Sequence, residues 1–499
     1  MSALPNRILI VGGGTAGWMA AALLSKLLPQ ARHAISLIES DEIGTVGVGE
    51  ATIPQLQLVN AVLGVDEDAF MRATLATYKL GIEFVGWGDA DSRYIHAFGN
   101  TGRPIGQTPF HHFWLRGLKL GERAPLDAYC LNAAVARAGR FARGAEAQSR
   151  MLGGPVHAFH FDAGLYAAFL RQYAEARGVT RIEGKIRHAG RDAETGDVTH
   201  VMLDGERAYG ADLFIDCSGF RALLIEGALG TGFESWTHWL PCDRALAVQC
   251  EGPAEIAPYT MSTARAAGWQ WRIPLQHRVG NGHVYCSDAI DDSVAADTLL
   301  ANLDGKPLTD PRPIRFTTGR RKQFWNRNVV ALGLAAGFLE PLESTSIHLV
   351  QSAIERIVTF LPNGPIRAAD VAAYNAQTVF EWERVRDFII LHYAANTRTE
   401  PFWRRCAAMP IPDTLTEKLD LFRASGRIIR IGDELFSEPG WLQVMIGQGM
   451  MPAGYHPLAD APSDAEMREF LSVIRQAVDK QAAALPSHRS WLQRHCWAA

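Results

Sequence analysis

Apolar and polar positions follow two different patterns in the opening stretch of the chain. Arg7–Val11 is a short apolar run, which predicts a buried strand, and Trp18–Leu28 is rich in alanine and leucine, which is typical of a helix. A second apolar run, Ile35–Glu39, predicts another strand that ends in an acid. The chain therefore opens with a strand, a helix and a strand.

Similar patterns predict the elements that follow. Helices are expected from their apolar spacing at Asp66–Tyr78, at Asp162–Gly178 and from Ser344 onward. Strands are expected at Ile82–Trp87, Ile182–Ile186, Val198–Leu203, Ala211–Gly219 and Val329–Gly333, with the second and third of these forming a hairpin. Trp236–Tyr285 alternates apolar and polar residues, which predicts a sheet with one face in water. From Ala368 the pattern is mainly helical, near residues 370–395, 414–425 and 463–484.

These elements predict a mixed α/β fold in two modules. Residues 1–360 are expected to form a nucleotide-binding α/β module with an inserted sheet, and residues 361–499 a separate, mainly helical module. The helix at Asp66–Tyr78 is expected to stop at Gly81, which suits a C-terminal cap, so that Lys79 lies at a helix end. Asp41–Pro54 is glycine-rich and is expected to be a loop.

Composition limits the classes of function. A chain of 499 residues with 47% hydrophobic and 20% charged residues is typical of a globular enzyme of two or three packed units. A net charge of −4 gives no electrostatic case for binding nucleic acid or an anionic membrane. No apolar run is long enough to span a bilayer, and the first strand leaves no room for a signal peptide. Seven cysteines without a C-x-x-C pattern predict reduced thiols in a cytoplasmic protein, and His111 and His112, which are adjacent and lack a second ligand pair, do not support a metal site.

A glycine-rich turn, Gly12–Gly17, joins the first strand to the first helix with the spacing G-x-G-x-x-G. In this pattern Gly12 permits the tight turn, Gly14 lets a pyrophosphate approach, and Gly17 lets the helix pack on the strand. Glu39 is placed to accept hydrogen bonds from a ribose. The pattern predicts one dinucleotide site without distinguishing FAD from NAD, and an ordinary glycine turn is the alternative.

Four motifs in a fixed order carry a resemblance to a known family: Gly12–Gly17, Gly47–Thr52, Trp269–Pro274 with the pattern W-x-W-x-I-P, and Pro341–Thr345. Together they resemble the flavin-dependent tryptophan halogenases, from residue 7 to about residue 450. The resemblance implies a flavoprotein monooxygenase-like fold, in which a box-shaped FAD module carries a helical, pyramid-like substrate module. It also implies that the cofactor is FAD rather than NAD.

The resemblance implies a reaction and its partners. A separate NAD(P)H-dependent flavin reductase would supply reduced FAD, which with O₂ and chloride or bromide gives hypohalous acid. That acid would pass to a separate pocket and halogenate a small, electron-rich aromatic. The resemblance leaves a homodimer open.

By position, Lys79 and Glu343 match the family's catalytic lysine and carboxylate. An ammonium group can polarise hypohalous acid or carry the halogen as a haloamine, and a carboxylate can take the ring proton. The structural alternatives are a lysine at a helix end and a carboxylate beside a helix N-cap at Ser344.

The resemblance assigns the other site residues by the group that each would contact. Thr15, Ala16, Ala51 and Leu334 would also contact FAD, and Thr345 and Ser346 would hold the halide at a helix start. Family members often have glycine where Ser346 stands. Trp269 and Trp271 would form a wall of the flavin pocket.

The substrate pocket is expected to be aromatic. His96 and Phe98 match a family pair that sandwiches an indole, with core packing as the alternative. Tryptophan-specific members carry a Tyr-Tyr pair, which the region Gly426–Gly449 lacks, and Phe436 and Trp441 are its large rings. Indole or an indole-like aromatic is therefore the preferred substrate class.

Two other functions remain open at this point. An aromatic hydroxylase of the same flavoprotein class would transfer oxygen directly, which a wall at Trp269 and Trp271 would oppose. A flavin-binding protein without turnover would leave Lys79 and Glu343 as helix-end charges.

Overall fold

The computed structural model describes residues 6–43 and 49–498. Contacts along the chain divide it into two compact units, each built from three segments. Unit 1 comprises Met1–Ala76, Phe161–Pro241 and Arg315–Glu383, and unit 2 comprises Thr77–His160, Cys242–Ile314 and Arg384–Ala499. Both units draw on residues before 360, so the division into modules at that residue stays a prediction.

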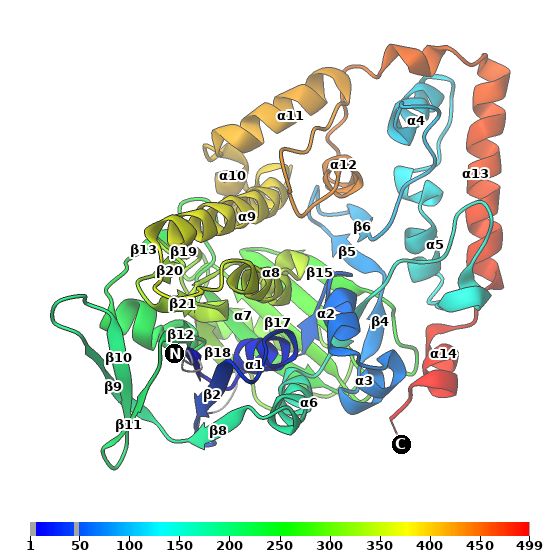
Figure 1. Ribbon diagram of the computed structural model, residues 1–499. Coiled ribbons are helices and arrows are strands. Elements are labelled where there is room, and N and C mark those ends of the chain that lie inside the picture. The colour runs from blue at the N-terminus through cyan, green and yellow to red at the C-terminus, as the bar shows by residue number, and fades with distance from the viewer. Residues whose placement is uncertain (1–5, 44–48, 499) are drawn as a thin grey trace. The chain divides into compact units, whose positions relative to one another are not determined.

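Unit 1 is organised around a six-stranded sheet in the order β20-β21-β12-β1-β2-β8. Strand β1 lies between β2 and β12 and is parallel to both. The side chains of Ile8–Val11 are buried, and α1 lies beside α6 and α8 (Figure 1). The expected strand–helix–strand opening is confirmed, and so is the α/β class. The main elements of this unit are β1 (Asn6–Val11), α1 (Thr15–Leu27), β2 (His33–Glu39), β3 (Glu50–Ala51), α2 (Leu56–Leu63), α3 (Glu67–Ala73), α6 (Ala163–Ala176), β8 (Thr180–Glu183), β12 (Leu213–Asp216), β20 (Trp325–Asn326), β21 (Val329–Ala331) and α8 (Ser346–Thr359).

Two smaller sheets complete unit 1, in the orders β11-β10-β9 and β13-β19-β22. The expected hairpin is partly wrong, because Ile182 belongs to β8 and pairs with Ile38 of β2 in the large sheet. Val198–Leu203 pairs instead with the strand that begins at Ile186. The strands are β9 (Ile186–Arg191), β10 (Val198–Leu203), β11 (Arg207–Gly210), β13 (Phe233–Ser235), β19 (Gly319–Arg321) and β22 (Gly337–Phe338).

Unit 2 holds a seven-stranded sheet in the order β18-β14-β17-β16-β15-β5-β6. Strand β15 alternates buried and partly exposed residues as expected, but every residue of β17 is buried. The expectation of one wet face is therefore wrong at the centre of the sheet, where Ala295 and Leu299 of α7 pack against Val248 and Tyr285. The strands and this helix are β5 (Gly81–Val85), β6 (Arg93–Ala97), β14 (Arg244–Cys250), β15 (Thr260–Arg265), β16 (Gly268–Pro274), β17 (Val279–Tyr285), α7 (Asp292–Leu300) and β18 (Arg312–Arg315).

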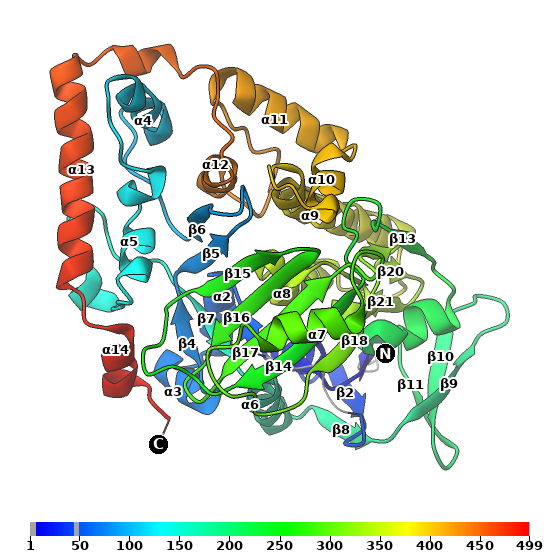
Figure 2. The same ribbon diagram turned by 180° about the vertical axis from the view of Figure 1, so that it is seen from behind.

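The remaining helices of unit 2 include three that lie side by side, with α13 running along α4 and α5 (Figures 1 and 2). Helix α12 lies against β6. The helices expected near residues 370–395, 414–425 and 463–484 are confirmed as α9, α11 and α13. The bounds are α4 (Phe110–Lys119), α5 (Leu131–Arg137), α9 (Ala368–Ala394, which reaches unit 2 at Arg384), α10 (Pro401–Ala408), α11 (Asp413–Ser425), α12 (Glu438–Gly447), α13 (Asp464–Ala484) and α14 (His488–His495).

The segment that carries Lys79 is a strand and not a helix end. Helix α3 begins at the expected place, where Asp66 caps it by accepting from the N–H of Ala69, but it ends at Ala73. β4 (Thr77–Lys79) then pairs antiparallel with β7 (Ala158–Phe161). Gly81 is no helix cap: it opens β5, where a Cβ would lie 2.5 Å from the carbonyl oxygen of His96. Partners distant in sequence thus overrode the helical pattern.

Three chain-wide features bear on the class of protein. All seven cysteines are free, as expected, and all but Cys217 are buried. In the part of the chain that the structure describes, no helix is long and apolar enough to cross a membrane. The described residues also contain no group of three or more histidines, cysteines or acids placed to hold a metal ion.

Candidate functional site

In the glycine turn after β1 there is space for a side chain at Gly14 but not at Gly12 or Gly17. Gly12 has φ of +109°, and a Cβ there would lie 2.3 Å from the carbonyl oxygen of Cys217. A Cβ on Gly17 would lie 1.9 Å from the carbonyl oxygen of Gly12, so this contact brings α1 close to β1. A Cβ on Gly14 would meet nothing within 4 Å. The open space at Gly14 fits a pyrophosphate, and the two filled positions hold the turn that shapes it.

Helix α1 begins at this open position without a side-chain cap. Gly14 is its N-cap residue, and the first hydrogen bond of the helix runs from Trp18 N–H to the Gly14 carbonyl at 3.1 Å. The preceding N–H groups at such a helix start favour an anion. Leu334 lies in a 3₁₀ turn that begins at Gly333, where a Cβ would be 3.0 Å from that of Ala16. The expected FAD contacts Ala16 and Leu334 therefore lie in neighbouring segments.

The Glu39 carboxylate lies over Gly13, where a Cβ would be 1.5 Å from Oε2. The Arg181 guanidinium donates to Glu39 Oε1 at 2.6 Å, and the Trp18 indole N–H donates to Oε2 at 3.2 Å. Arg181 stands on β8, next to β2, and the sequence motif contains no signal for it. These contacts hold the acid at the end of β2, where a ribose-binding carboxylate is expected.

Residues 44–48, which include the first two residues of the second glycine motif, lie outside the described residues, and the described part of the motif contains β3. Ala51, an expected FAD contact, is buried there. Burial raises the pKa of the neighbouring Glu50 to about 7. Sequence reasoning did not single out Glu50, and a carboxyl group that titrates near neutrality is a common feature of functional sites.

The segment from Glu343 to Ser346 combines a buried acid, a strained residue and a helix start. Glu343 ends a 3₁₀ turn and is 2% exposed, and Ser344 has φ of +57°, which non-glycine residues rarely adopt. Ser344 was expected to be the N-cap of the next helix, but the N-cap of α8 is Thr345. No side chain makes a capping hydrogen bond at this helix start. The first hydrogen bond of α8 runs from Leu349 N–H to the Thr345 carbonyl, so the preceding N–H groups lie at the helix start.

Helix α8 is anchored by one carboxylate of α9. Glu381 binds Arg356 at 2.7 Å, Ser352 at 2.8 Å and His348 at 3.0 Å, all on one side of α8. Burial alone would raise the pKa of Glu381, but its hydrogen bonds and these nearby charges lower it below its ordinary value. The helix that begins at the candidate halide residues is therefore held by a charged partner that sequence reasoning missed.

In unit 2, Lys79 is fully buried on β4. Its Nζ lies 5.5 Å from the centre of the Phe98 ring, and Phe98 is placed by a hydrogen bond from its N–H to the Leu80 carbonyl at 2.9 Å. Phe98 therefore faces the ammonium group of Lys79. A cation over an aromatic ring is stabilised electrostatically, most of all where water is excluded.

The strand that carries Lys79 is tied to the W-x-W-x-I-P motif. The Thr77 hydroxyl donates to the carbonyl of Pro274 at 2.6 Å, so its oxygen must accept from Nδ1 of His160 at 3.1 Å. His160 Nε2 then accepts from the Thr260 hydroxyl at 2.9 Å. Burial, together with the charges of Lys79 and His488, lowers the pKa of His160 well below its ordinary value. His160 is therefore a neutral link between three strands.

Most of the expected substrate residues meet in one buried aromatic cluster in unit 2. His96 of β6 lies 6.2 Å from the Phe436 ring, and Phe436 stacks on Phe388 at 3.7 Å between ring centres. Trp441 meets Phe388 edge to face at 4.7 Å. Sequence reasoning missed Phe388, which belongs to α9, while Phe98 lies with Lys79.

The two tryptophans of the W-x-W-x-I-P motif have different surroundings. Trp269 lies 6.2 Å from Trp87 in a cluster of large rings. The Trp271 ring covers Gly282 on the next strand, where a Cβ would be 2.0 Å from it, and its N–H has no partner among the described residues. The role of the pair as a flavin-pocket wall stays a prediction.

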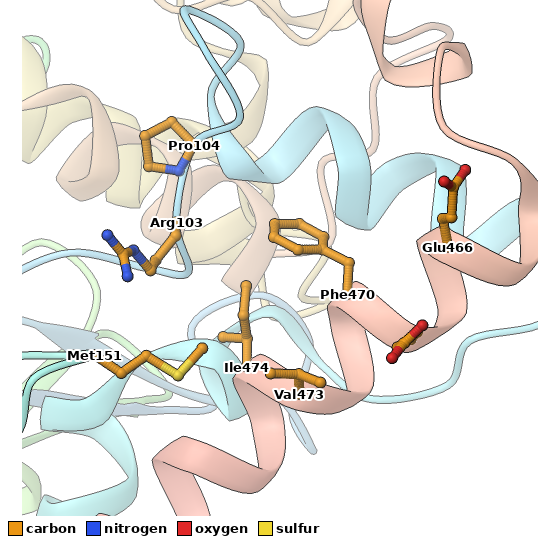
Figure 3. A pocket seen from close by; sticks show the side chains of 8 residues that line it. Arg103, Pro104, Met151, Glu466, Phe470, Val473 and Ile474 are labelled. Atoms are coloured by element: carbon orange, nitrogen blue, oxygen red, sulfur yellow. The ribbon is translucent and has the colours of Figure 1, made fainter.

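A separate pocket of about 490 Å³ lies between α13 and the segment near Arg103 (Figure 3). Arg103, Pro104 and Met151 line it together with side chains of α13 such as Phe470 and Ile474. None of the candidate catalytic, cofactor or substrate residues lines this pocket.

Comparisons with known proteins agree on one family. The sequence model named tryptophan halogenase matches residues 7–464. Tryptophan 7-halogenase RebH from Lentzea aerocolonigenes is 34% identical over 99% of both chains. Among solved structures, Xcc4156, a flavin-dependent halogenase from Xanthomonas campestris, is 51% identical over 99% of both chains with a TM-score of 0.96. BrvH, a flavin-dependent halogenase from Brevundimonas sp. BAL3, is 45% identical over 98% of this chain and 99% of its own, with a TM-score of 0.94.

Proposed function

The chain belongs to the tryptophan halogenase family of flavin-dependent halogenases, and we propose that it uses reduced FAD, O₂ and chloride or bromide to halogenate indole or an indole-like aromatic. The observation that supports the catalytic part is the buried ammonium group of Lys79, which faces the Phe98 ring. Lys79 stands on a strand that is hydrogen-bonded to the W-x-W-x-I-P motif.

Unit 1 supplies groups that fit FAD. The open position at Gly14 and the uncapped start of α1 suit the pyrophosphate, and Glu39 suits the adenosine ribose. When bound, reduced FAD supplies with O₂ the oxidising power that converts a halide into hypohalous acid. Thr15, Ala16, Ala51 and Leu334 complete the proposed contacts.

The start of α8 suits the halide. Thr345 and Ser346 precede the first hydrogen bond of this helix, so their N–H groups and the positive end of the helix dipole favour an anion. The left-handed backbone at Ser344 turns the chain at the point where the helix begins.

Lys79 and Glu343 share the substitution step in this proposal. The ammonium group donates a hydrogen bond to the oxygen of hypohalous acid, which polarises the oxygen–halogen bond. The aromatic carbon attacks the halogen as the oxygen–halogen bond breaks, and the oxygen takes a proton from the Lys79 ammonium group and leaves as water. The Glu343 carboxylate takes the ring proton, and exchange with water then restores both side chains. Both residues are buried, which strengthens such interactions.

The aromatic cluster supports a flat, apolar substrate. His96, Phe388, Phe436 and Trp441 offer ring faces and edges that suit an indole. The region Gly426–Gly449 lacks a Tyr-Tyr pair. We therefore expect indole to be turned over with a higher kcat/KM than free tryptophan.

A single fingerprint for a dinucleotide implies that reduced FAD comes from a separate flavin reductase. The test is mass spectrometry of indole and tryptophan incubated with the pure protein, reduced FAD, O₂ and chloride or bromide. We expect a halogen isotope pattern on the product, mainly with indole. A hydroxylated product that forms without halide would show a hydroxylase, and no product with any substrate would favour a flavin-binding protein without turnover.

A further inference from the structure

A buried ammonium group is enclosed beside the aromatic cluster of unit 2. Lys418 of α11 and Glu434 have side chains that are 6% and 1% exposed. Lys418 Nζ lies 3.1 Å and 3.3 Å from the two carboxylate oxygens of Glu434 and 2.6 Å from the carbonyl oxygen of Ile429. It also lies 4.7 Å from the centre of the Trp441 ring. We call these partners, Glu434, Ile429 and Trp441, the ammonium cage.

The cage has the parts that recognise a primary alkylammonium ion. A carboxylate and a carbonyl accept N–H bonds, and the face of an indole attracts a cation. The cage is also held from outside, because the N–H of Ile431 donates to Glu434 at 3.2 Å. Glu434 therefore keeps a hydrogen-bond donor when Lys418 is shortened.

The ammonium cage shares a wall with the candidate substrate cluster. Trp441 forms one side of the cage, and the same ring meets Phe388 edge to face. An aromatic molecule with an aminoalkyl arm would find an anion one ring away from Phe388 if Glu434 were free. Glu434 is not free, because Lys418 already occupies the cage.

We propose that the ammonium cage is a binding site for primary alkylammonium ions that Lys418 fills from within, so that Lys418 determines specificity against amine-bearing aromatics. The cage rests only on the geometry above, while its effect on specificity rests on the proposed halogenase function. Shortening Lys418 opens the site, and neutralising Glu434 removes it.

The cage is tested by chemical rescue in the full-length protein. Lys418→Ala deletes the atoms that n-propylammonium would restore, so this ion is the probe, with tetramethylammonium at the same concentration as the control salt. We expect n-propylammonium to raise the melting temperature of Lys418→Ala by several degrees, but not that of the wild type. The matched variant is Lys418→Ala with Glu434→Gln, which should show no such rise because the anion is gone.

The proposed binding site would be contradicted if n-propylammonium and tetramethylammonium shifted the melting temperature of Lys418→Ala equally. It would also be contradicted if n-propylammonium shifted the single and the double variant equally. If Lys418→Ala does not accumulate as folded protein, it is produced with and without n-propylammonium. Folded protein only in its presence supports the cage, and none in either condition overturns it.

The effect on specificity is tested by the ratio of halogenated tryptamine to halogenated indole. Lys418→Ala should raise this ratio by about tenfold or more, and the double variant should not. An unchanged ratio in a rescued variant would overturn the role in specificity. A wild type that halogenates neither compound would contradict the proposed function, whereas the melting experiment would still decide the cage.

Discussion

Three charged residues stand out at the scale of single side chains. Lys79 is fully buried, Glu343 is 2% exposed, and burial raises the pKa of Glu50 to about 7. A charge that is removed from water interacts more strongly with any partner that reaches it. Glu50 and Glu343 lie within two of the motifs that carry the resemblance, and the strand of Lys79 is hydrogen-bonded to a third. Each of the three residues can be tested by substitution.

The open position at Gly14 predicts a variant that folds but does not bind the cofactor. Gly14→Val places its side chain where nothing lies within 4 Å, so the free energy of unfolding should change by no more than about 1 kcal/mol. FAD binding should be lost, because the branch fills the space proposed for the pyrophosphate. Flavin fluorescence titration and melting of the free protein check both points. Gly12→Val is the contrast: its Cβ would lie 2.3 Å from a carbonyl oxygen, so it should fail to fold.

Glu50 predicts how stability changes with pH. Its pKa is about 7 in the folded protein, above the ordinary value of 4.5, so between these values the folded state keeps a proton that the unfolded state has lost. This residue therefore lowers stability as pH rises through that window, by at most about 1.4 kcal/mol per pH unit, and adds no further change above it. Glu50→Gln should remove this dependence.

The measurement is the melting temperature of the cofactor-free protein from pH 5 to pH 8. The difference between Glu50→Gln and wild type should grow in favour of the variant up to about pH 7 and then level off. The exposed Glu255→Gln serves as control and should run parallel to the wild type. A constant difference for Glu50→Gln would mean that this carboxyl group titrates normally.

At the scale of elements, β4 is the strand on which the proposal depends. Its Thr77 hydroxyl joins the Pro274 carbonyl to His160, which in turn accepts from Thr260. Lys79 lies two residues further along this strand, on the same face. The W-x-W-x-I-P motif therefore holds the strand of the candidate catalytic lysine through the hydrogen bond between Thr77 and Pro274.

Thr77→Val tests this support. The variant keeps the shape of the side chain but removes the partner of the Pro274 carbonyl and of the Nδ1–H of His160, both of them buried, which should cost about 1–3 kcal/mol. Halogenated product per reduced FAD consumed should fall, because Lys79 is held less firmly, while FAD binding should not change. Thr378→Val is the matched control, since its equally buried hydroxyl donates to the carbonyl of Tyr374 in its own helix. Equal product yields from both variants would contradict a positioning role for Thr77.

At the scale of the whole molecule, periodicity predicted the elements whose partners are near in sequence. β1, α1 and β2, and later α8, α11 and α13, lie where the pattern placed them. The helix expected at Asp66–Tyr78 was too long because Thr77–Lys79 pairs with a strand about eighty residues away. Such a partner leaves no trace in the local pattern.

The residues of the candidate site also fall into those that the local sequence predicted and those that it did not. Motifs identified Gly14, Glu39 and Lys79, whose roles depend on residue type and spacing. Arg181, Phe388 and Lys418 were missed, because each acts through a side chain that only the tertiary fold brings to it. An arginine on a strand or a lysine on an amphipathic helix is more often an ordinary surface residue, so composition alone could not select them.

The central claim is that Lys79 directs hypohalous acid to the substrate after the halide has been oxidised. The most direct measurement is halogenated indole formed per reduced FAD consumed, for the wild type and Lys79→Met, which preserves the volume of this buried side chain. Lys306→Met, at an exposed lysine, is the control. Lys79→Met is expected to bind FAD and consume reduced FAD as the wild type does, while its product yield falls by about 10²-fold or more. A Lys79→Met protein that is folded and halogenates indole at the wild-type yield would contradict the central claim.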